Sequence, residues 1–248
     1  MAVTPEGTEQ ASGPAAAAPS RSAAPGRHQD FEVDPRVTAL YRAQRAALIG
    51  TLGLWFRPEV TGKENVPATG PVILAPVHRS FADFSFAAFC TPRKIFFMTK
   101  DEMWERKWLG RWLLTVGAFP VHRESADREA VQRAQSVLDR GQCLVLFPEG
   151  TRQSGPKLHP LFEGAAFVAA RAGVPLVPVG IGGSEWAMPK GSRKIKRVKV
   201  VVVVGDPIPP PARSESGRLP RRGVTELTER LTVDLQAVYD QAMQAAGR

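Results

Sequence analysis

Residues 71–83 read PVILAPVHRSFAD, which is an apolar run of strand length followed at once by a polar turn. Similar apolar runs recur along the chain at residues 94–98, 143–147, 175–179 and 198–204. Helical stretches, for example residues 125–140 and 164–172, lie between them. Continuous apolar strands that alternate with helices predict an α/β fold, with a single central, mostly parallel or mixed β-sheet flanked by helices.

The chain's 248 residues are enough for one catalytic domain with tails. Residues 1–34 are rich in Ala and Pro, and the first thirty include no aromatic residue, so a disordered tail is predicted there. Residues 35–223 form the predicted catalytic domain, which begins with a helix at 35–56. Residues 224–248 are predicted to form an amphipathic helix packed on that domain, with an apolar stripe at Val224, Leu227, Leu231, Leu235 and Val238.

The formal net charge of +9 points to a polyanionic partner, which is nucleic acid, an anionic membrane surface or a phosphorylated substrate. The predicted helix at 35–56 ends in Trp55 and Phe56 beside Arg57, which fits either a membrane-interface helix or a helix packed on the core. Its apolar stretch, residues 46–56, is shorter than the roughly 20 residues of a spanning helix. We therefore expect peripheral or monotopic attachment to a membrane.

Three tryptophans recur every four residues, at Trp104, Trp108 and Trp112, with Lys and Arg beside them. This spacing predicts that they share one side of a single helix. A tryptophan stripe bordered by cations suits a membrane interface or an acyl chain, but tryptophans at helical spacing equally suit a packed core. Both interpretations stay open at this point.

The two cysteines, Cys90 and Cys143, lie in apolar runs. We interpret them as small core residues in a reducing compartment and not as a disulfide. The chain has no Cys/His spacing of the kind that binds zinc, so no structural metal is predicted.

The polar turn after the first strand holds His78, Ser80 and Asp83. Ser80 followed three residues later by Asp83 matches a capping box, with Ser80 as the N-cap of a new helix. The Asp83 carboxylate then leans back toward His78, where it can hold one imidazole nitrogen and leave the other free to act as a base. The alternative is an ordinary helix cap beside a surface histidine.

A second polar turn, Phe-Pro-Glu-Gly-Thr-Arg at residues 147–152, ends the third apolar run. Ligands of open α/β sheets bind at strand ends, and a Pro/Gly turn is expected to expose backbone N–H groups to an anion. Arg152 adds a fork for phosphate, while Glu149 either orients a hydroxyl or holds the Arg152 guanidinium. The alternative is a tight turn with a structural ion pair. Residues 117–123 place a further arginine, Arg123, after an apolar stretch.

Taken together and in this order, these segments resemble the glycerolipid acyltransferase family, and within it the 1-acyl-glycerol-3-phosphate acyltransferases. The resemblance covers residues 64–208 and rests on blocks of that family, matched here by His78 and Asp83, Lys100, Arg123, residues 147–152 and residues 174–178. Three positions depart from the family pattern: Val77 replaces a common Asn, Pro120 replaces a common aromatic residue, and residues 161–164 lack a common lysine.

The resemblance implies a glycerol-3-phosphate acyltransferase-like fold and transfer of a fatty acyl group to the free hydroxyl of 1-acyl-glycerol-3-phosphate, which makes phosphatidic acid in phospholipid biosynthesis. The donor is acyl-CoA or an acyl carrier protein thioester, with no further cofactor, and His78 acts as the base that Asp83 orients. The substrate-binding positions that it implies are Lys100, Arg123, Glu149, Gly150, Thr151 and Arg152. The expected location is the cytoplasmic face of the cell membrane.

The sequence is also compatible with other functions. Another lysolipid or glycerol-3-phosphate is an alternative acceptor for the same chemistry. A serine hydrolase with Ser80 as nucleophile is a different class, although the chain has no G-x-S-x-G elbow. A non-catalytic basic module is a third, since residues 190–199 contain six Lys or Arg. No nucleic-acid motif accompanies that run, so we expect a membrane-facing or solvated patch and no nucleic-acid partner.

Overall fold

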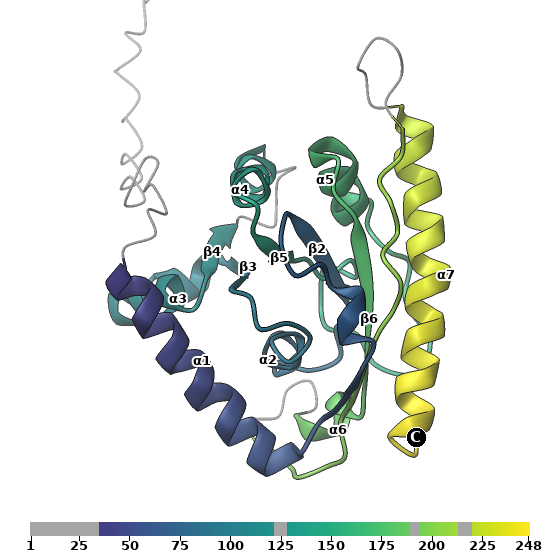
Figure 1. The fold of residues 1–248 in the computed structure, drawn as a ribbon. Helices are drawn as coiled ribbons and strands as arrows, with labels where there is room; N and C mark the ends of the chain where they lie inside the picture. Colours follow the sequence, from purple (N-terminus) through teal and green to yellow (C-terminus); the bar gives the residue numbers. More distant parts are fainter. Residues whose placement is uncertain (1–34, 122–127, 189–193, 213–219) are drawn as a thin grey trace, which may run out of the picture. The chain divides into compact units, whose positions relative to one another are not determined.

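A computed structural model describes residues 35–121, 128–188, 194–212 and 220–248. One mixed sheet has the strand order β1-β7-β6-β2-β5-β3-β4 (Figure 1). Its strands are β1 (Glu59–Thr61), β2 (Val72–Pro76), β3 (Ile95–Lys100), β4 (Ala118–Val121), β5 (Cys143–Val145), β6 (Leu176–Gly182) and β7 (Val201–Val204). All neighbouring pairs are parallel except β6 and β7, which confirms the predicted fold class. The two edge strands, β1 and β4, were not predicted, because runs of three and four residues carry little periodicity.

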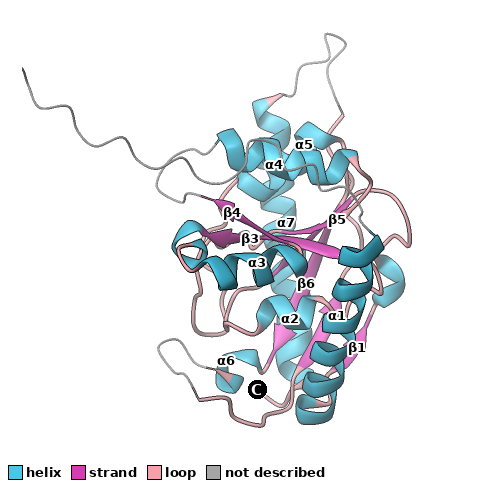
Figure 2. Cartoon of the chain, turned by 90° about the vertical axis from the view of Figure 1, so that its left-hand side faces the viewer, coloured by secondary structure: helices cyan, strands magenta, loops and turns pink. Residues whose placement is uncertain are grey.

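Helices cover both faces of the sheet. They are α1 (Pro35–Phe56), α2 (Asp83–Ala87), α3 (Lys107–Thr115), α4 (Arg128–Asp139), α5 (Gly164–Ala172), α6 (Ser184–Ala187) and α7 (Arg221–Ala245). On one side, α4, α5 and α7 pack on strands β5, β2 and β6, and on the other lie α1, α2 and α3 (Figure 1, and from the side in Figure 2). Two 3₁₀ turns, Lys63–Asn65 and Asp101–Trp104, complete the described elements.

Helix α1 buries some of its side chains in the fold and exposes others. Tyr41 and Phe56 are buried, and the Tyr41 hydroxyl accepts a hydrogen bond from the Ile95 amide (3.1 Å) at the start of β3. Leu54 and Trp55, by contrast, are 78% and 49% exposed. Among the described residues, no helix has both the length and the apolar character that crossing a membrane requires.

The three tryptophans do not share one helix, so that prediction is wrong. Trp104 ends a 3₁₀ turn, and the extended backbone of Arg106 (ψ 107°) separates it from α3. The Trp104 indole turns inward and donates a hydrogen bond to the Thr99 hydroxyl (2.8 Å), whereas Trp108 and Trp112 are 67% and 44% exposed on α3. The first tryptophan therefore packs in the fold, and the other two face outward.

Both cysteines are free and buried, as predicted. Burial raises the pKa of each thiol to about 12. At neutral pH both groups therefore stay protonated, and a thiolate-dependent reaction does not reach them in the folded protein.

Helix α7 lies against β6 at backbone contact. A methyl group added to Gly180 would collide with the Val238 carbonyl, and one added to Gly182 would collide with the Ala242 carbonyl. The stripe of Val224, Leu227, Leu231, Leu235 and Val238 is buried along the same helix. Small residues on the strand thus bring the helix close, and the apolar stripe holds it there.

Replacement of Gly180 by alanine tests this contact. We expect Gly180→Ala to lower the free energy of unfolding by about 1–3 kcal/mol or more, because the backbone of α7 must move away from β6. Urea unfolding followed by circular dichroism measures the change. Gly164→Ala is the matched control, since a methyl group at this position in α5 meets no atom within 4 Å. Equal unfolding midpoints for the two variants would show that α7 is not held at this distance.

Candidate active site

The two predicted polar turns meet at the C-terminal ends of the inner strands β2 and β5. Strands β2 and β5 are parallel neighbours, so the segments that follow them leave the sheet at the same edge. The His78 ring stacks on Phe147, with centroids 4.1 Å apart and planes at 28°. The His78 amide donates to Oε2 of Glu149 (2.9 Å), and the Gln153 amide donates to the His78 carbonyl (2.8 Å). The backbone of His78 is therefore fastened to the second turn on both sides.

The imidazole of His78 faces a buried carboxylate. Its Nδ1 lies 3.3 Å from Oδ2 of Asp83, whose side chain is fully buried, while the His78 side chain is 15% exposed. The same oxygen accepts hydrogen bonds from the amides of Arg79 and Ser80, each at 2.6 Å. Among the described residues, no group hydrogen-bonds Nε2 of His78. With Nδ1–H donated to Asp83, the lone pair on Nε2 is available to accept a proton.

Only half of the predicted capping box forms: the Asp83 carboxylate accepts the Ser80 amide (2.6 Å), but the Ser80 hydroxyl does not cap the helix. Helix α2 begins at Asp83 itself, and its N-cap is Ala82 without a side-chain cap. Asp83 directs its carboxylate backward at the turn, as expected, but Ser80 is not the cap residue. The Ser80 hydroxyl is buried and donates to the Met188 carbonyl (3.2 Å), and it accepts weakly from the Ala82 amide (3.4 Å). These contacts occupy the hydroxyl and give no support to Ser80 as a nucleophile.

Glu149 pairs with Arg79 and not with Arg152, which corrects the prediction for this residue. The Nη1 atom of Arg79 lies 2.7 Å from both Glu149 oxygens, and both side chains are fully buried. Burial alone would lower the Arg79 pKa, but the hydrogen bond and charge of Glu149 raise it above its ordinary value. Arg79 therefore keeps its charge. Arg79 was missed from the sequence, although a cation next to the predicted base, in a turn that faces a neighbouring strand end with an acid, is a usable signal.

In the turn at residues 147–152, the amides of Gly150 and Thr151 are already bonded within the turn and do not face an anion, contrary to the prediction. The Gly150 amide donates to the Phe147 carbonyl (3.0 Å), and the Thr151 amide donates to the Glu149 carbonyl (2.7 Å). Gly150 has φ 67°, and a methyl group there would press on the Phe162 ring, so this position favours glycine. Thr151 is exposed and Arg152 half-buried at the rim, which leaves the Arg152 side chain as the group that can reach an anion.

Two further residues of the predicted site, Lys100 and Arg123, have side chains outside the described part of the structure. Lys100 ends β3, which runs parallel to β5 and therefore ends at the same edge of the sheet, but its side chain is not described. Arg123 lies outside the described residues. Within the described ranges, no three His, Cys, Asp or Glu side chains come together in a way that could hold a metal ion.

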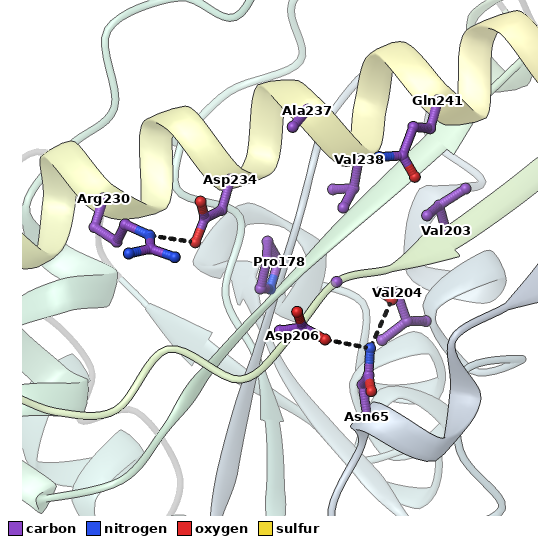
Figure 3. Close-up of a pocket in the computed structure, with 11 residues that line it drawn as sticks. Asn65, Pro178, Val203, Val204, Asp206, Arg230, Asp234, Ala237, Val238 and Gln241 are labelled. Atoms are coloured by element: carbon purple, nitrogen blue, oxygen red, sulfur yellow. Dashed lines mark hydrogen bonds and ion pairs between the residues drawn. The ribbon is translucent and has the colours of Figure 1, made fainter.

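A cavity of about 290 Å³ between α7 and strands β6 and β7 includes none of the predicted site residues (Figure 3). Four of its polar side chains form pairs: Arg230 donates to Asp234 (2.7 Å), and Asn65 donates to Asp206 (3.1 Å). Gln241 also lines the cavity, but none of the motif residues does, so the strand-end site around His78 is the stronger candidate.

The chain is similar to proteins of one known family. The profile of a family described as Acyltransferase matches residues 57–182. A 1-acyl-sn-glycerol-3-phosphate acyltransferase of Bacillus subtilis (strain 168) is 31% identical over 170 residues, which are 68% of this chain and 82% of the relative. One of Streptococcus pneumoniae is 30% identical over 175 residues (70% and 62%). The chloroplastic protein BAT2 of Brassica napus, of the same name, is 28% identical over 158 residues and is covered for 46% of its length.

The fold is also found in solved structures. The 1-acyl-sn-glycerophosphate acyltransferase PlsC from Thermotoga maritima superposes with a TM-score of 0.65 and 22% identity, covering 88% of this chain and 86% of that one. At this identity the likeness establishes the arrangement of strands and helices.

Removal of the charge on Glu149 tests the buried pair. We expect Glu149→Gln to lower the free energy of unfolding by about 3–5 kcal/mol, because the Arg79 guanidinium stays buried without its counter-ion. Chemical denaturation measures the loss. The exposed pair Arg222–Glu226 supplies the control, where Glu226→Gln should change stability by less than about 1 kcal/mol. Similar small changes in both variants would mean that Arg79 has another counter-ion or reaches solvent.

Proposed function

The chain belongs to the acyltransferase family, and we propose that it transfers a fatty acyl group from an acyl thioester to the free hydroxyl of 1-acyl-glycerol-3-phosphate. The product is phosphatidic acid, a precursor of phospholipids. The observation that carries the proposal is the His78 imidazole held between the buried Asp83 carboxylate and the turn at residues 147–152. The names of the relatives at about 30% identity support this acceptor.

The reaction follows from the orientation of the imidazole. Nε2 of His78 removes the proton of the acceptor hydroxyl as that oxygen attacks the thioester carbonyl, and Asp83 stabilises the imidazolium through Nδ1–H. The tetrahedral intermediate collapses with cleavage of the carbon–sulfur bond, and the proton on Nε2 passes to the leaving thiolate. The ester forms directly, without an acyl-enzyme. A positioned base contributes about 10²–10⁴-fold, and alignment of the two substrates supplies the rest.

The acceptor phosphate is assigned to the cations around the turn. Arg152 lies at the rim of the site, and its planar fork suits two phosphate oxygens. Arg123 and Lys100 are further proposed members of the phosphate set. Gly150 and Thr151 set the shape of the turn, and Glu149, which is buried, acts on His78 and Arg79 and not on substrate. Acyl-CoA and acyl carrier protein both satisfy the chemistry as donors, and no cofactor enters the mechanism.

We further propose that the protein lies on the cytoplasmic, anionic face of a membrane through the C-terminal end of α1. An apolar groove of about 340 Å³ is lined there by Thr51, Leu52, Trp55, Phe56 and Ile195. Leu54 (78%), Ile195 (56%) and Trp55 (49%) are exposed around it. Exposed cations border the same patch, namely Arg57, Lys194, Lys196, Arg197 and Lys199. Apolar side chains ringed by cations suit an anionic headgroup layer.

The first test compares wild type with His78→Ala for thiol release from palmitoyl-CoA in the presence of detergent-dispersed lysophosphatidic acid. We expect acceptor-dependent release that falls by about 10²–10⁴-fold in the variant, since the base is lost. The protein's own thiols, with pKa values of about 12, stay silent toward the thiol reagent.

The control for that assay is His159→Ala, because His159 is exposed and outside the proposed site. This variant should retain wild-type activity. If folded wild-type protein releases no thiol with lysophosphatidic acid, other lysolipids, glycerol-3-phosphate and an acyl carrier protein donor are tried next. Failure with all of them would contradict the proposed reaction.

The membrane proposal predicts that Leu54→Glu weakens binding to vesicles that contain anionic lipid by roughly tenfold, since a charge replaces an inserted leucine. Sedimentation with liposomes measures binding. Val233→Glu is the matched control, because Val233 is similarly exposed (66%) but lies on α7. Equal binding by both variants, or binding of DNA in preference to vesicles at moderate salt, would contradict the assignment.

A further inference from the structure

We propose that Tyr239, on the C-terminal helix α7, is a positioning residue for His78, which it reaches through Arg79 and Glu149. Tyr239 is 160 residues away from Arg79 in sequence, yet its hydroxyl accepts a hydrogen bond from Nε of Arg79 (3.3 Å). The proposal rests on the catalytic role given to His78 above and deepens it, because it names the part of the chain that holds the base in place.

Tyr239 restrains the Arg79 guanidinium in two ways. The hydroxyl receives the Nε–H and itself donates to the Gly155 carbonyl (3.2 Å), so it is fixed in direction. The ring lies beneath the guanidinium, with Cζ of Arg79 5.0 Å from its centroid. Both residues are only 1% exposed. Burial raises the Tyr239 pKa above its ordinary value, against an opposing effect of Arg79, so the phenol stays neutral and keeps its proton.

Arg79 transmits this restraint to the catalytic backbone. Its Nη1 holds both oxygens of Glu149 at 2.7 Å, and Oε2 of Glu149 receives the His78 amide at 2.9 Å. Its Nε also donates to the Gly155 carbonyl, and its Nη2 donates to the Lys157 carbonyl, each at 3.2 Å. A carboxylate that is free to rotate would not keep a fixed acceptor for the His78 amide. The guanidinium fixes it, and Tyr239 holds the guanidinium together with the carbonyls of Gly155 and Lys157.

A second pair of contacts joins the loop at residues 155–158 to α7. The Gln236 side chain donates to the Pro156 carbonyl (3.0 Å) and accepts from the Leu158 amide (2.9 Å). Gln236 bonds the backbone of this loop and not the Arg79 side chain, so it acts on Arg79 only indirectly, through the loop carbonyls. This difference allows the contribution of Tyr239 to be separated from general docking of the helix.

The decisive variant is Tyr239→Phe, which keeps the ring and removes only the hydroxyl. We expect kcat to fall about tenfold with KM for both substrates nearly unchanged, because a lost hydrogen bond to a charged group loosens the base and not the binding sites. Tyr41→Phe is the matched control. Tyr41 is also buried, and its hydroxyl accepts from the Ile95 amide at the opposite, N-terminal end of a strand, so kcat should stay unchanged in the detergent assay.

A double substitution separates positioning from loss of packing. If Tyr239 acts through Arg79, adding Tyr239→Phe to Arg79→Lys should cost far less than tenfold, since the route is already broken. Glu149→Gln provides the same background if Arg79→Lys does not fold. Full additivity of the two losses, or a kcat for Tyr239→Phe equal to that of Tyr41→Phe, would overturn the proposal.

Hydrogen exchange of the His78 backbone amide tests the positioning role of Tyr239 independently of activity. The chain has four histidines, so ¹⁵N-histidine labelling gives few signals to follow. We expect the His78 amide to exchange about tenfold faster in Tyr239→Phe and at the wild-type rate in Tyr41→Phe. Unchanged exchange in both variants would refute the positioning role. If wild type fails to transfer acyl groups, the proposed function fails, whereas the exchange rates still test the link from Tyr239 to His78.

Discussion

The Glu149 carboxylate, shared between the Arg79 guanidinium and the His78 amide, is the interaction on which the site depends. It joins the turn after β5 to the turn after β2, which the parallel pairing of those strands has already brought side by side. Both side chains are buried, so the cost of desolvating the two charges is offset by their mutual hydrogen bonds and by the further bonds that Arg79 and Glu149 make to their surroundings. The Glu149 carboxylate, held by Arg79, in turn holds the His78 backbone amide beside Asp83.

The sheet supplies the frame for this interaction. Parallel pairing of β2 with β5 and of β5 with β3 brings their C-terminal ends to one edge, where His78, the 147–152 turn and Lys100 follow or end the strands. The antiparallel pair of β6 and β7 lies on the other side of β2 and carries α7. Because Gly180 and Gly182 have no side chains, α7 comes close enough to β6 for Tyr239 to reach Arg79. The close contact between α7 and β6 thus both packs the core and places Tyr239 at the site.

Polar and apolar surfaces are separated on the molecule in a way that suits a water-soluble phosphate joined to a lipid chain. The rim of the site has the half-buried Arg152, whereas the end of α1 exposes Leu54 and Trp55 beside a basic segment. The aromatic contact between Phe56 and Phe86 (5.4 Å) links that end of α1 to α2, the helix that begins with Asp83. The groove and the base are therefore built on adjoining elements.

The sequence by itself determined the α/β class, the strands around which the sheet forms and the family, because apolar runs and short motifs are local and survive without knowledge of packing. It also indicated that Asp83 turns back toward His78. It did not reveal that α2 starts at Asp83, that the Trp104 side chain leaves the stripe, or that Glu149 takes Arg79 in place of Arg152. Ser80 and Arg79 have partners distant in the chain, Met188 and Tyr239, whereas Trp104 turns onto Thr99 and Gly110, which are near in the chain but lie in other elements. Local patterns fix where strands and turns begin, but which buried charge pairs with which is decided only when the strands are side by side, because burial leaves a charged group no partner except the one that the fold brings to it.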